Sequence, residues 1–414
     1  MSSLDQDKGS GNSNTDPAKV KSNNSEYPII LASGIDSLYL SIKAEWLHRN
    51  FLEYLDKEKT RAELEEKSIS IEFENEDKSE EWKGIICPYG AMGYKWLLIS
   101  KDYKMKIADW NESKQTIRPN IMVDISSECL WTLGPKAAAG KIISLFSGLG
   151  AKLLSVKPNR VDICVDVLLD VNLWTSAIMV DSRVTRSRKL KTNYDNSTME
   201  TITIGNGKLI ARIYDKVREI KFHSKKDWMY DIWGIKNVPD SNKVIRVEFQ
   251  IRREVIKELG IDTITHLFTH IENLWAYCTI NWLKFQDNPG KHHTQRKTLP
   301  FWEGIQNGFR KEQDANPLIR SKAINIDTKQ LFNQTHGLMT SFTAAGMAAF
   351  DPEGKLTPNM DISLSLFKQM AEREGKGEEF FSDNVDSKRA KYYRDQEKMA
   401  ITLDKRKKLG FPVG

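Results

Sequence analysis

Three segments in the middle of the chain alternate apolar and ionisable residues with a period of two. They span residues 160–167, 209–216 and 243–251. Successive side chains of a β-strand point to opposite faces of its sheet, so this alternation predicts three strands that each have one apolar and one charged face. A Gly-Asn-Gly sequence at 205–207 precedes the second segment and predicts that this strand completes a β-hairpin.

The charged faces of the three segments carry residue types that suit metal-assisted phosphoryl transfer. If the strands are neighbours, one face of the sheet collects Asp162, Asp166, Arg212, Tyr214, Arg246 and Glu248. Carboxylates bind divalent metal ions, and arginine binds phosphate. The alternative is that these charges form only the solvated face of an antiparallel sheet. Two aspartates on one face repel each other unless a positive group lies between them, so the three strands together favour a site.

The same segments resemble the rolling-circle replication initiation factor family. This family includes trans-acting plasmid Rep proteins, related filamentous-phage initiators and small conjugative relaxases. The matching segments are residues 159–167, 201–216 and 244–253, and residues 34–42 resemble the family's opening strand less closely. The resemblance spans roughly residues 30–285.

The resemblance implies a specific chemistry. It implies that Tyr214 attacks DNA, and that Asp162, Asp166 and Glu248 on the neighbouring strands hold a divalent metal ion. Many related nicking enzymes coordinate their metal through a His-hydrophobe-His strand, and this sequence contains no such motif. A set of oxygen ligands favours Mg²⁺ or Mn²⁺ over zinc.

The proposed nucleophile needs activating groups, because a free tyrosine has a pKa of about 10 and is a weak nucleophile at neutral pH. A metal ion held by the carboxylates polarises the scissile phosphate. We expect Arg212 or Arg246 to bind a non-bridging oxygen, and Lys216 to lower the pKa of Tyr214 or contact the leaving strand. The alternative for Lys216 is a solvent-exposed position on the next helix. The expected products are a 5′-phosphotyrosine, from which strands can be rejoined, and a free 3′-hydroxyl.

Other residues compete for these roles. Tyr194 lies in a polar loop, and Tyr392 and Tyr393 lie in a basic segment near the C-terminus, so none of them is beside an acidic strand. His266 and His270 stand four residues apart on a predicted helix. That spacing allows a metal site, but a hydrogen-bonded pair on a helix is the alternative that we favour.

Composition is compatible with a nucleic-acid-binding protein. The chain has 414 residues, of which 40% are hydrophobic, so it is long enough to bury a large core. Its formal net charge is +6, which is compatible with binding to nucleic acid. Positive charge is concentrated at residues 183–191, 216–226, 291–297 and 388–408. The first of these runs suits a loop that grips the DNA backbone, although a solvated basic loop is the alternative.

Cysteine usage and hydropathy predict the compartment. The four cysteines lack any CxxC spacing, which is most typical of a reduced, cytoplasmic protein. No run of about 18 apolar residues is present, so we expect no transmembrane helix and no membrane partner. Residues 1–27 have almost no apolar content and predict a disordered tail.

The remaining pattern places further elements along the chain. It predicts strands at 34–42, 84–87, 94–99, 103–108 and 117–125. It predicts helices within 44–67, 136–155, 255–259, 263–285 and 301–349. Domain boundaries follow from this pattern: a nicking domain at 28–285, a linker at 286–300 and a mainly helical C-terminal region at 301–414.

We therefore predict an α+β fold, in which helices pack on one face of an antiparallel sheet and a DNA-binding cleft lies on the other. The resemblance implies a metal-dependent, site-specific DNA nickase and strand transferase that initiates rolling-circle replication of a plasmid, phage or mobile element. The alternatives are a conjugative relaxase with the same chemistry and a non-catalytic DNA-binding protein. Expected partners are single-stranded or cruciform origin DNA, a host helicase and a second copy of the chain. The C-terminal region is expected to recognise origin DNA, recruit a helicase or mediate self-association.

Overall fold

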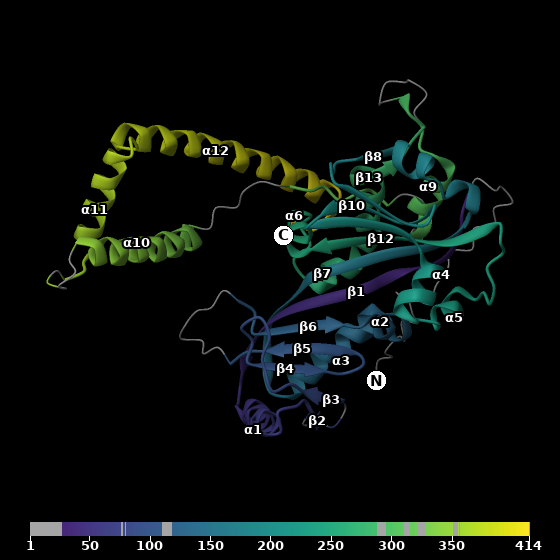
Figure 1. The fold of residues 1–414 in the computed structure, drawn as a ribbon, viewed down its shortest axis with the longest axis horizontal. Helices are drawn as coiled ribbons and strands as arrows, with labels where there is room; N and C mark the ends of the chain where they lie inside the picture. Colours follow the sequence, from purple (N-terminus) through teal and green to yellow (C-terminus); the bar gives the residue numbers. More distant parts are fainter. Residues whose placement is uncertain are drawn as a thin grey trace, which may run out of the picture. The chain divides into compact units, whose positions relative to one another are not determined.

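The computed structural model describes residues 27–75, 78, 80–109, 118–287, 295–309, 315–321, 328–350, 355 and 357–413. The chain divides into two compact units, residues 1–320 with 411–414, and residues 321–410 (Figure 1). Except for Tyr27, the tail predicted at 1–27 lies outside the described residues.

The first unit is built on one large antiparallel sheet with the strand order β2-β3-β4-β5-β6-β1-β7-β12-β11-β10-β9. Its strands are β1 (Ile29–Trp46), β2 (Ile69–Glu74), β3 (Glu81–Ile86), β4 (Trp96–Ile99), β5 (Tyr103–Ile107), β6 (Ile121–Ile125), β7 (Ala151–Asp170), β9 (Leu190–Asp195), β10 (Thr198–Asn206), β11 (Leu209–Asp215) and β12 (Asn242–Arg252). This confirms the predicted α+β class. The predicted hairpin is β10-β11, in which Asn206 pairs with Leu209 and Gly207 takes a φ of 67°, a conformation that favours glycine.

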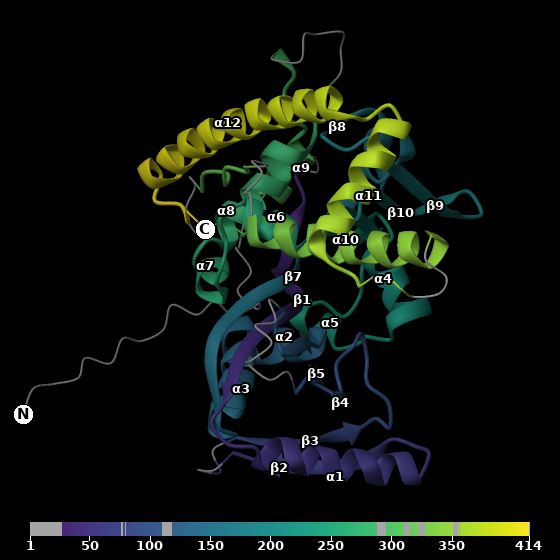
Figure 2. The ribbon, with the colours of Figure 1, turned by 90° about the vertical axis from the view of Figure 1, so that its left-hand side faces the viewer.

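Two strands are much longer than the sequence predicted. β1 and β7 pair along almost their whole length and curve together through the sheet (Figure 2). The start of the helix predicted at 44–67 and the end of the helix predicted at 136–155 are therefore wrong. α1 begins at Asn50, and residues 151–155 belong to β7. Pairing of Trp46 with Ala151 and of Ala44 with Leu153 extends both strands, because tertiary pairing overrides a weak local helix propensity.

Helices lie on both faces of the sheet. They are α1 (Asn50–Leu64), α2 (Ser127–Leu133), α3 (Pro135–Gly148), α4 (Lys216–Glu219), α5 (Met229–Trp233), α6 (Arg253–Glu258), α7 (Ile264–Thr269), α8 (Ile271–Ala276) and α9 (Pro300–Gln306). The main core packs against the apolar face. A second cluster lies on the other face and consists of Leu31, Ala32, Trp131, Cys164, Ile220, Met229, Trp233 and Val244. The helices are therefore not confined to one face, because this second cluster covers one end of the face that carries the charged residues.

The long helix predicted at 263–285 is broken. α7 ends at Thr269, and α8 is followed by a wider helical turn at Tyr277–Trp282 and by β13 (Leu283–Phe285). β13 pairs with β8 (Arg183–Thr185), which explains why the helix does not continue.

The first unit extends beyond the predicted boundary at 285. α9 buries Phe301, Trp302 and Ile305 in the main core, and the Trp302 indole donates to the Thr279 carbonyl at 2.9 Å. Residues 300–309 and 315–320 therefore belong with the sheet rather than with the C-terminal region. Residues 288–294 of the predicted linker lie outside the described residues.

The second unit is helical, as predicted for the C-terminal region. It consists of α10 (Thr328–Phe350), α11 (Met360–Arg373) and α12 (Glu378–Lys408). Throughout the described residues of both units, every helix is too short or too polar to span a membrane.

Candidate functional site

The three alternating segments are adjacent strands, as predicted. β12 lies between β7 and β11, and both pairings are antiparallel. In the register, Asp166, Arg246 and Tyr214 lie side by side across the sheet. One step along the same face, Cys164, Glu248 and Arg212 lie side by side, followed by Asp162 and Gln250. The structure therefore places all six predicted residues on one face.

Within this face, Tyr214, Glu248 and Arg212 form one hydrogen-bonded group. The Tyr214 hydroxyl donates to Oε2 of Glu248 at 3.0 Å, and Nη1 of Arg212 donates to Oε1 of the same carboxylate at 3.0 Å. Nη2 of Arg212 also donates to the Gln250 side-chain oxygen at 2.9 Å. Burial raises the pKa of Tyr214 well above its usual value, and the Glu248 charge adds to the rise. Tyr214 is therefore a neutral phenol whose proton points at a carboxylate held in place by an arginine.

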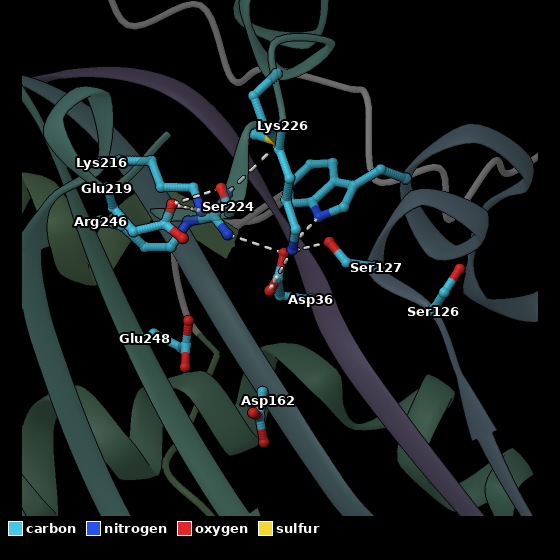
Figure 3. A network of polar contacts seen from close by, with 12 residues as sticks. Asp36, Ser126, Ser127, Asp162, Lys216, Glu219, Ser224, Lys226, Arg246 and Glu248 are labelled. Carbon is cyan, nitrogen blue, oxygen red and sulfur yellow. Dashed lines mark hydrogen bonds and ion pairs between the residues drawn. The ribbon is translucent and has the colours of Figure 1, made fainter. Parts of the chain in front are cut away.

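Arg246 and Asp166 form a separate, fully buried group. Nε and Nη2 of Arg246 donate to the two Asp166 oxygens at 2.6 and 2.7 Å. Nη1 of Arg246 donates to Asp36 at 2.8 Å (Figure 3). The indole of Trp233 donates to Oδ2 of Asp166 at 2.8 Å. Both Arg246 and Asp166 have 0% of their side-chain surface exposed. Arg246 therefore presents no donor at the surface, and the contacts of its guanidinium suit positioning better than the predicted contact with a phosphate oxygen.

Asp36 is a residue of this site that the sequence analysis did not single out. Its Oδ1 accepts from Ser127 Oγ at 2.8 Å and from the Trp131 indole at 3.0 Å (Figure 3). Burial acts to raise the pKa of Asp36. The positive charges of Arg246, Lys226 and Lys216 together outweigh this effect, so the net shift of the pKa is downward.

The position of Asp36 explains why it was missed. It lies at a β-bulge, because Ile35 pairs with Ile163 and the next paired residue, Ser37, pairs with Asp162. A bulge interrupts the period of two, so alternation alone does not show which face Asp36 joins. The only signal was its place inside the segment that resembles the family's opening strand.

Lys216 is buried rather than solvent-exposed. Its side chain is 2% exposed, which rules out the solvent-exposed alternative. Its Nζ donates to Glu219 at 2.6 Å and lies 5.7 Å from the centre of the Tyr214 ring. Burial lowers the pKa of Lys216, and the nearby positive charge of Arg246 lowers it to a smaller extent. Glu219, which also accepts from Ser224 at 3.1 Å, is a second residue that the sequence analysis missed.

Asp162 lies beside Glu248 and is paired with Arg160. Nε of Arg160 donates to Oδ1 of Asp162 at 2.8 Å, and its Nη2 donates to Oδ2. Burial raises the pKa of Asp162 to about 6; the Arg160 hydrogen bond opposes this rise and the Glu248 charge adds to it. The two carboxylates therefore repel each other.

The donor set fits a metal ion only in part. Both Asp166 oxygens accept hydrogen bonds from buried donors, so Asp166 does not suit the role of a ligand. In the described part of the chain, no three His, Cys, Asp or Glu side chains converge as a metal site. Asp162 and Glu248 also accept hydrogen bonds at both oxygens, but their arginine partners Arg160 and Arg212 are 23% and 33% exposed and are able to exchange for a cation. A cation would relieve the mutual repulsion of this pair. Binding of Mg²⁺ or Mn²⁺ stays a prediction.

The competing residues have other surroundings. Tyr194 lies on the edge strand β9 and not in the predicted loop, and its hydroxyl is 2.6 Å from Ser176 Oγ. His266 lies in α7, but His270 lies in the turn between α7 and α8, where its Nδ1 is 3.3 Å from the Asn273 side-chain oxygen, so the two histidines do not share one helix as predicted. Cys164 is fully buried in the second apolar cluster and serves packing.

Comparison with solved structures gives only distant likenesses. No family model matches the chain, and no curated protein matches it. The chain is similar in structure to a rolling circle replication initiator protein from Geobacillus stearothermophilus, with 15% sequence identity and a TM-score of 0.36 over 66% of this chain and 95% of that chain. At this identity and TM-score, the likeness assigns no role to any residue of this chain.

Proposed function

We propose that the chain is a site-specific DNA nicking and strand-transfer enzyme with Tyr214 as its nucleophile. The observation that carries the proposal is the 3.0 Å hydrogen bond from the Tyr214 hydroxyl to Glu248, with Arg212 holding the other oxygen of that carboxylate. A nucleophile within hydrogen-bond reach of a base, which a third group orients, is the arrangement of nucleophilic catalysis. The sequence resemblance supports DNA as the substrate and initiation of rolling-circle replication of a plasmid, phage or mobile element as the role.

The reaction follows from this arrangement. The Tyr214 oxygen attacks the scissile phosphorus while its proton passes to Glu248, because a phenol with a raised pKa does not ionise alone at neutral pH. The bond from phosphorus to the 3′ oxygen breaks, and this oxygen takes a proton from water to become a 3′-hydroxyl. The 5′ phosphate stays on Tyr214. In the reverse direction a 3′-hydroxyl attacks this linkage and rejoins the strand.

Neighbouring cations stabilise the charge that develops. Arg212 is 33% exposed, so its remaining N–H groups are able to reach a phosphate oxygen. The Lys216 ammonium over the Tyr214 ring favours negative charge on the phenolic oxygen. Arg246 acts indirectly: it lies on β12, the neighbour of the nucleophile's strand, and holds Asp166 of β7 and Asp36 of β1.

We propose Asp162 and Glu248 as the residues that would hold Mg²⁺ or Mn²⁺. When bound, such an ion would polarise the scissile phosphate. A conjugative relaxase would use the same site, and the two enzymes differ in the element that they serve. The non-catalytic alternative is less well supported, because it does not require Tyr214 to lie within hydrogen-bond reach of a base that an arginine orients. Cruciform or single-stranded origin DNA, a helicase and a second copy of the chain remain the proposed partners.

Covalent adduct formation tests the proposal. Wild-type chain, Tyr214→Phe and Glu248→Gln are incubated with labelled single-stranded DNA from the genetic element that encodes the chain, with Mn²⁺ or with EDTA, and resolved on a denaturing gel. We expect an adduct from wild type that EDTA and Tyr214→Phe abolish, and adduct formation roughly 10²-fold slower in Glu248→Gln, because a positioned base contributes about that much.

Tyr194→Phe serves as the matched control and should form the adduct at the wild-type rate. An adduct that survives in Tyr214→Phe would move the nucleophile to another tyrosine. DNA binding by wild type without any adduct would favour the non-catalytic alternative. Full activity in EDTA would remove the metal ion from the proposal.

A further inference from the structure

Two arginines occupy directly opposite positions on neighbouring strands of the charged face. Arg252 of β12 pairs with Arg160 of β7 in the antiparallel register, one step beyond the pair of Gln250 and Asp162. Like charges directly opposite each other on neighbouring strands are destabilising. Asp162 compensates only Arg160, and within the described residues the exposed Arg252 side chain makes no ion pair. An uncompensated local conflict of this kind is expected at a functional site.

An aromatic ring supports the arginine pair. Tyr39 of β1 is the register partner of Arg160 on its other side, and the Arg160 guanidinium lies 5.0 Å from the centre of the Tyr39 ring. Burial is the main influence that raises the pKa of Tyr39, whereas the charges of Arg160 and Arg252 both act to lower it. Both guanidinium groups are therefore close enough to act on the same phenol.

This group is open to solvent and continuous with the proposed active site. Arg160 keeps 23% of its side chain exposed, and neither arginine belongs to the second apolar cluster that covers the Asp166 end of the face. Arg252 follows Glu248 by four residues on β12, a separation of about 13 Å along an extended strand. A single DNA strand that passes Tyr214 is able to continue along the same face to Arg252.

We propose that Arg160 and Arg252 form a phosphate clamp for the backbone of the bound DNA strand, a few nucleotides from the bond that Tyr214 cleaves. A phosphate between the two guanidinium groups replaces their repulsion with charge-assisted hydrogen bonds. Tyr39 positions Arg160 by lying against its guanidinium plane. The clamp rests on the proposed function for its substrate.

Binding of a fluorescent single-stranded oligothymidylate, measured by anisotropy over a range of salt concentrations, tests the clamp. The full chain carries Tyr214→Phe throughout, so that no adduct forms. We expect Arg252→Gln to weaken binding about tenfold and to reduce the slope of log K against log salt by about 0.7, the value for one phosphate contact on a single strand. Arg252→Lys should keep most of the slope, and Tyr39→Phe should bind better than Tyr39→Leu.

Lys257→Gln is the matched control. It removes one positive charge from an exposed position of α6, whose Val255 and Ile256 pack in the main core on the opposite face. It should change neither affinity nor slope. Arg252→Gln should also unfold at the same or a higher temperature than its parent without DNA, because the repulsion is removed. Binding of Arg252→Gln equal to that of Lys257→Gln, or a lower unfolding temperature, would overturn the clamp.

The two proposals fail in different ways. If wild type never forms an adduct but Arg252→Gln still weakens DNA binding, the proposed chemistry fails and the clamp stands as a DNA-binding site. If the adduct depends on Tyr214 but Arg252→Gln binds like Lys257→Gln, the clamp fails and the proposed function stands.

Discussion

Burial assigns different tasks to the arginines of the charged face. Arg246 is enclosed between Asp166 and Asp36, whereas Arg212 and Arg160 each pair with one carboxylate and keep part of their surface exposed. Desolvation of a guanidinium costs several kcal/mol, which only close carboxylates offset, so the buried arginine is held by two of them. The exposed arginines remain available to phosphate.

Loss of Arg246 should therefore destabilise the fold strongly. We expect Arg246→Met to lower the free energy of unfolding by about 3 to 5 kcal/mol, because it leaves two buried carboxylates without their cation. Urea denaturation followed by circular dichroism measures this change. Arg49→Met is the control, since Arg49 makes a similar two-point contact with Asp109 but is 50% exposed. It should cost about 1 kcal/mol or less. Equal losses in the two variants would contradict the account.

Asp36 should make the stability depend on pH. The pKa of Asp36 is lower in the folded chain than in the unfolded chain. As the pH falls, the unfolded chain therefore binds more protons at this position than the folded chain does, and acid destabilises the fold. The stabilisation by the Asp36 charge is therefore complete above pH of about 4 and is lost on further acidification. We expect the difference in unfolding free energy between wild type and Asp36→Asn to stay constant from about pH 7 to about pH 5 and to shrink below about pH 4. A constant difference would show that the folded-state pKa is not lowered.

At the scale of elements, alternation located the strands of the site well. β7, β11 and β12 are neighbours, and the inward and outward faces of Leu209–Asp215 are those that the pattern predicts. A period of two is set by the backbone itself, so it survives in any sheet. The bulge at Asp36 breaks this period, and the pattern accordingly failed to place that residue.

Element ends were predicted less well, because long-range pairing decides them. Residues 44–46 and 151–155 have helical patterns in isolation but form the far ends of β1 and β7. The helix expected at 263–285 is broken after Thr269, and its last turn ends at Trp282 because β13 pairs with β8, more than ninety residues earlier in the chain. Local sequence contains no information about such a partner.

At the scale of the molecule, the main core decides where the first unit ends. We expect a chain that ends at residue 320 to unfold cooperatively, and a chain that ends at 285 to lack a stable fold. The shorter chain loses Phe301, Trp302 and Ile305 from the core. Loss of each large buried side chain costs roughly 2 to 5 kcal/mol, and the sum approaches the total stability of a typical domain, about 5 to 15 kcal/mol.

Thermal unfolding followed by near-ultraviolet circular dichroism compares the two truncated chains. In the full chain, Trp302→Ala alone should cost about 3 to 5 kcal/mol. A sharp unfolding transition in the chain that ends at 285 would show that α9 is not part of the folding unit.

The sequence by itself determined the class of fold, the three strands of the site and the face on which their charged residues lie, because side-chain alternation follows from strand geometry alone. Tertiary structure decided which charges meet. It joined Tyr214 to Glu248, enclosed Arg246 between Asp166 and Asp36, and set Arg160 opposite Arg252. These contacts depend on the register between strands that are far apart in the chain and on burial, and neither is encoded in the local pattern.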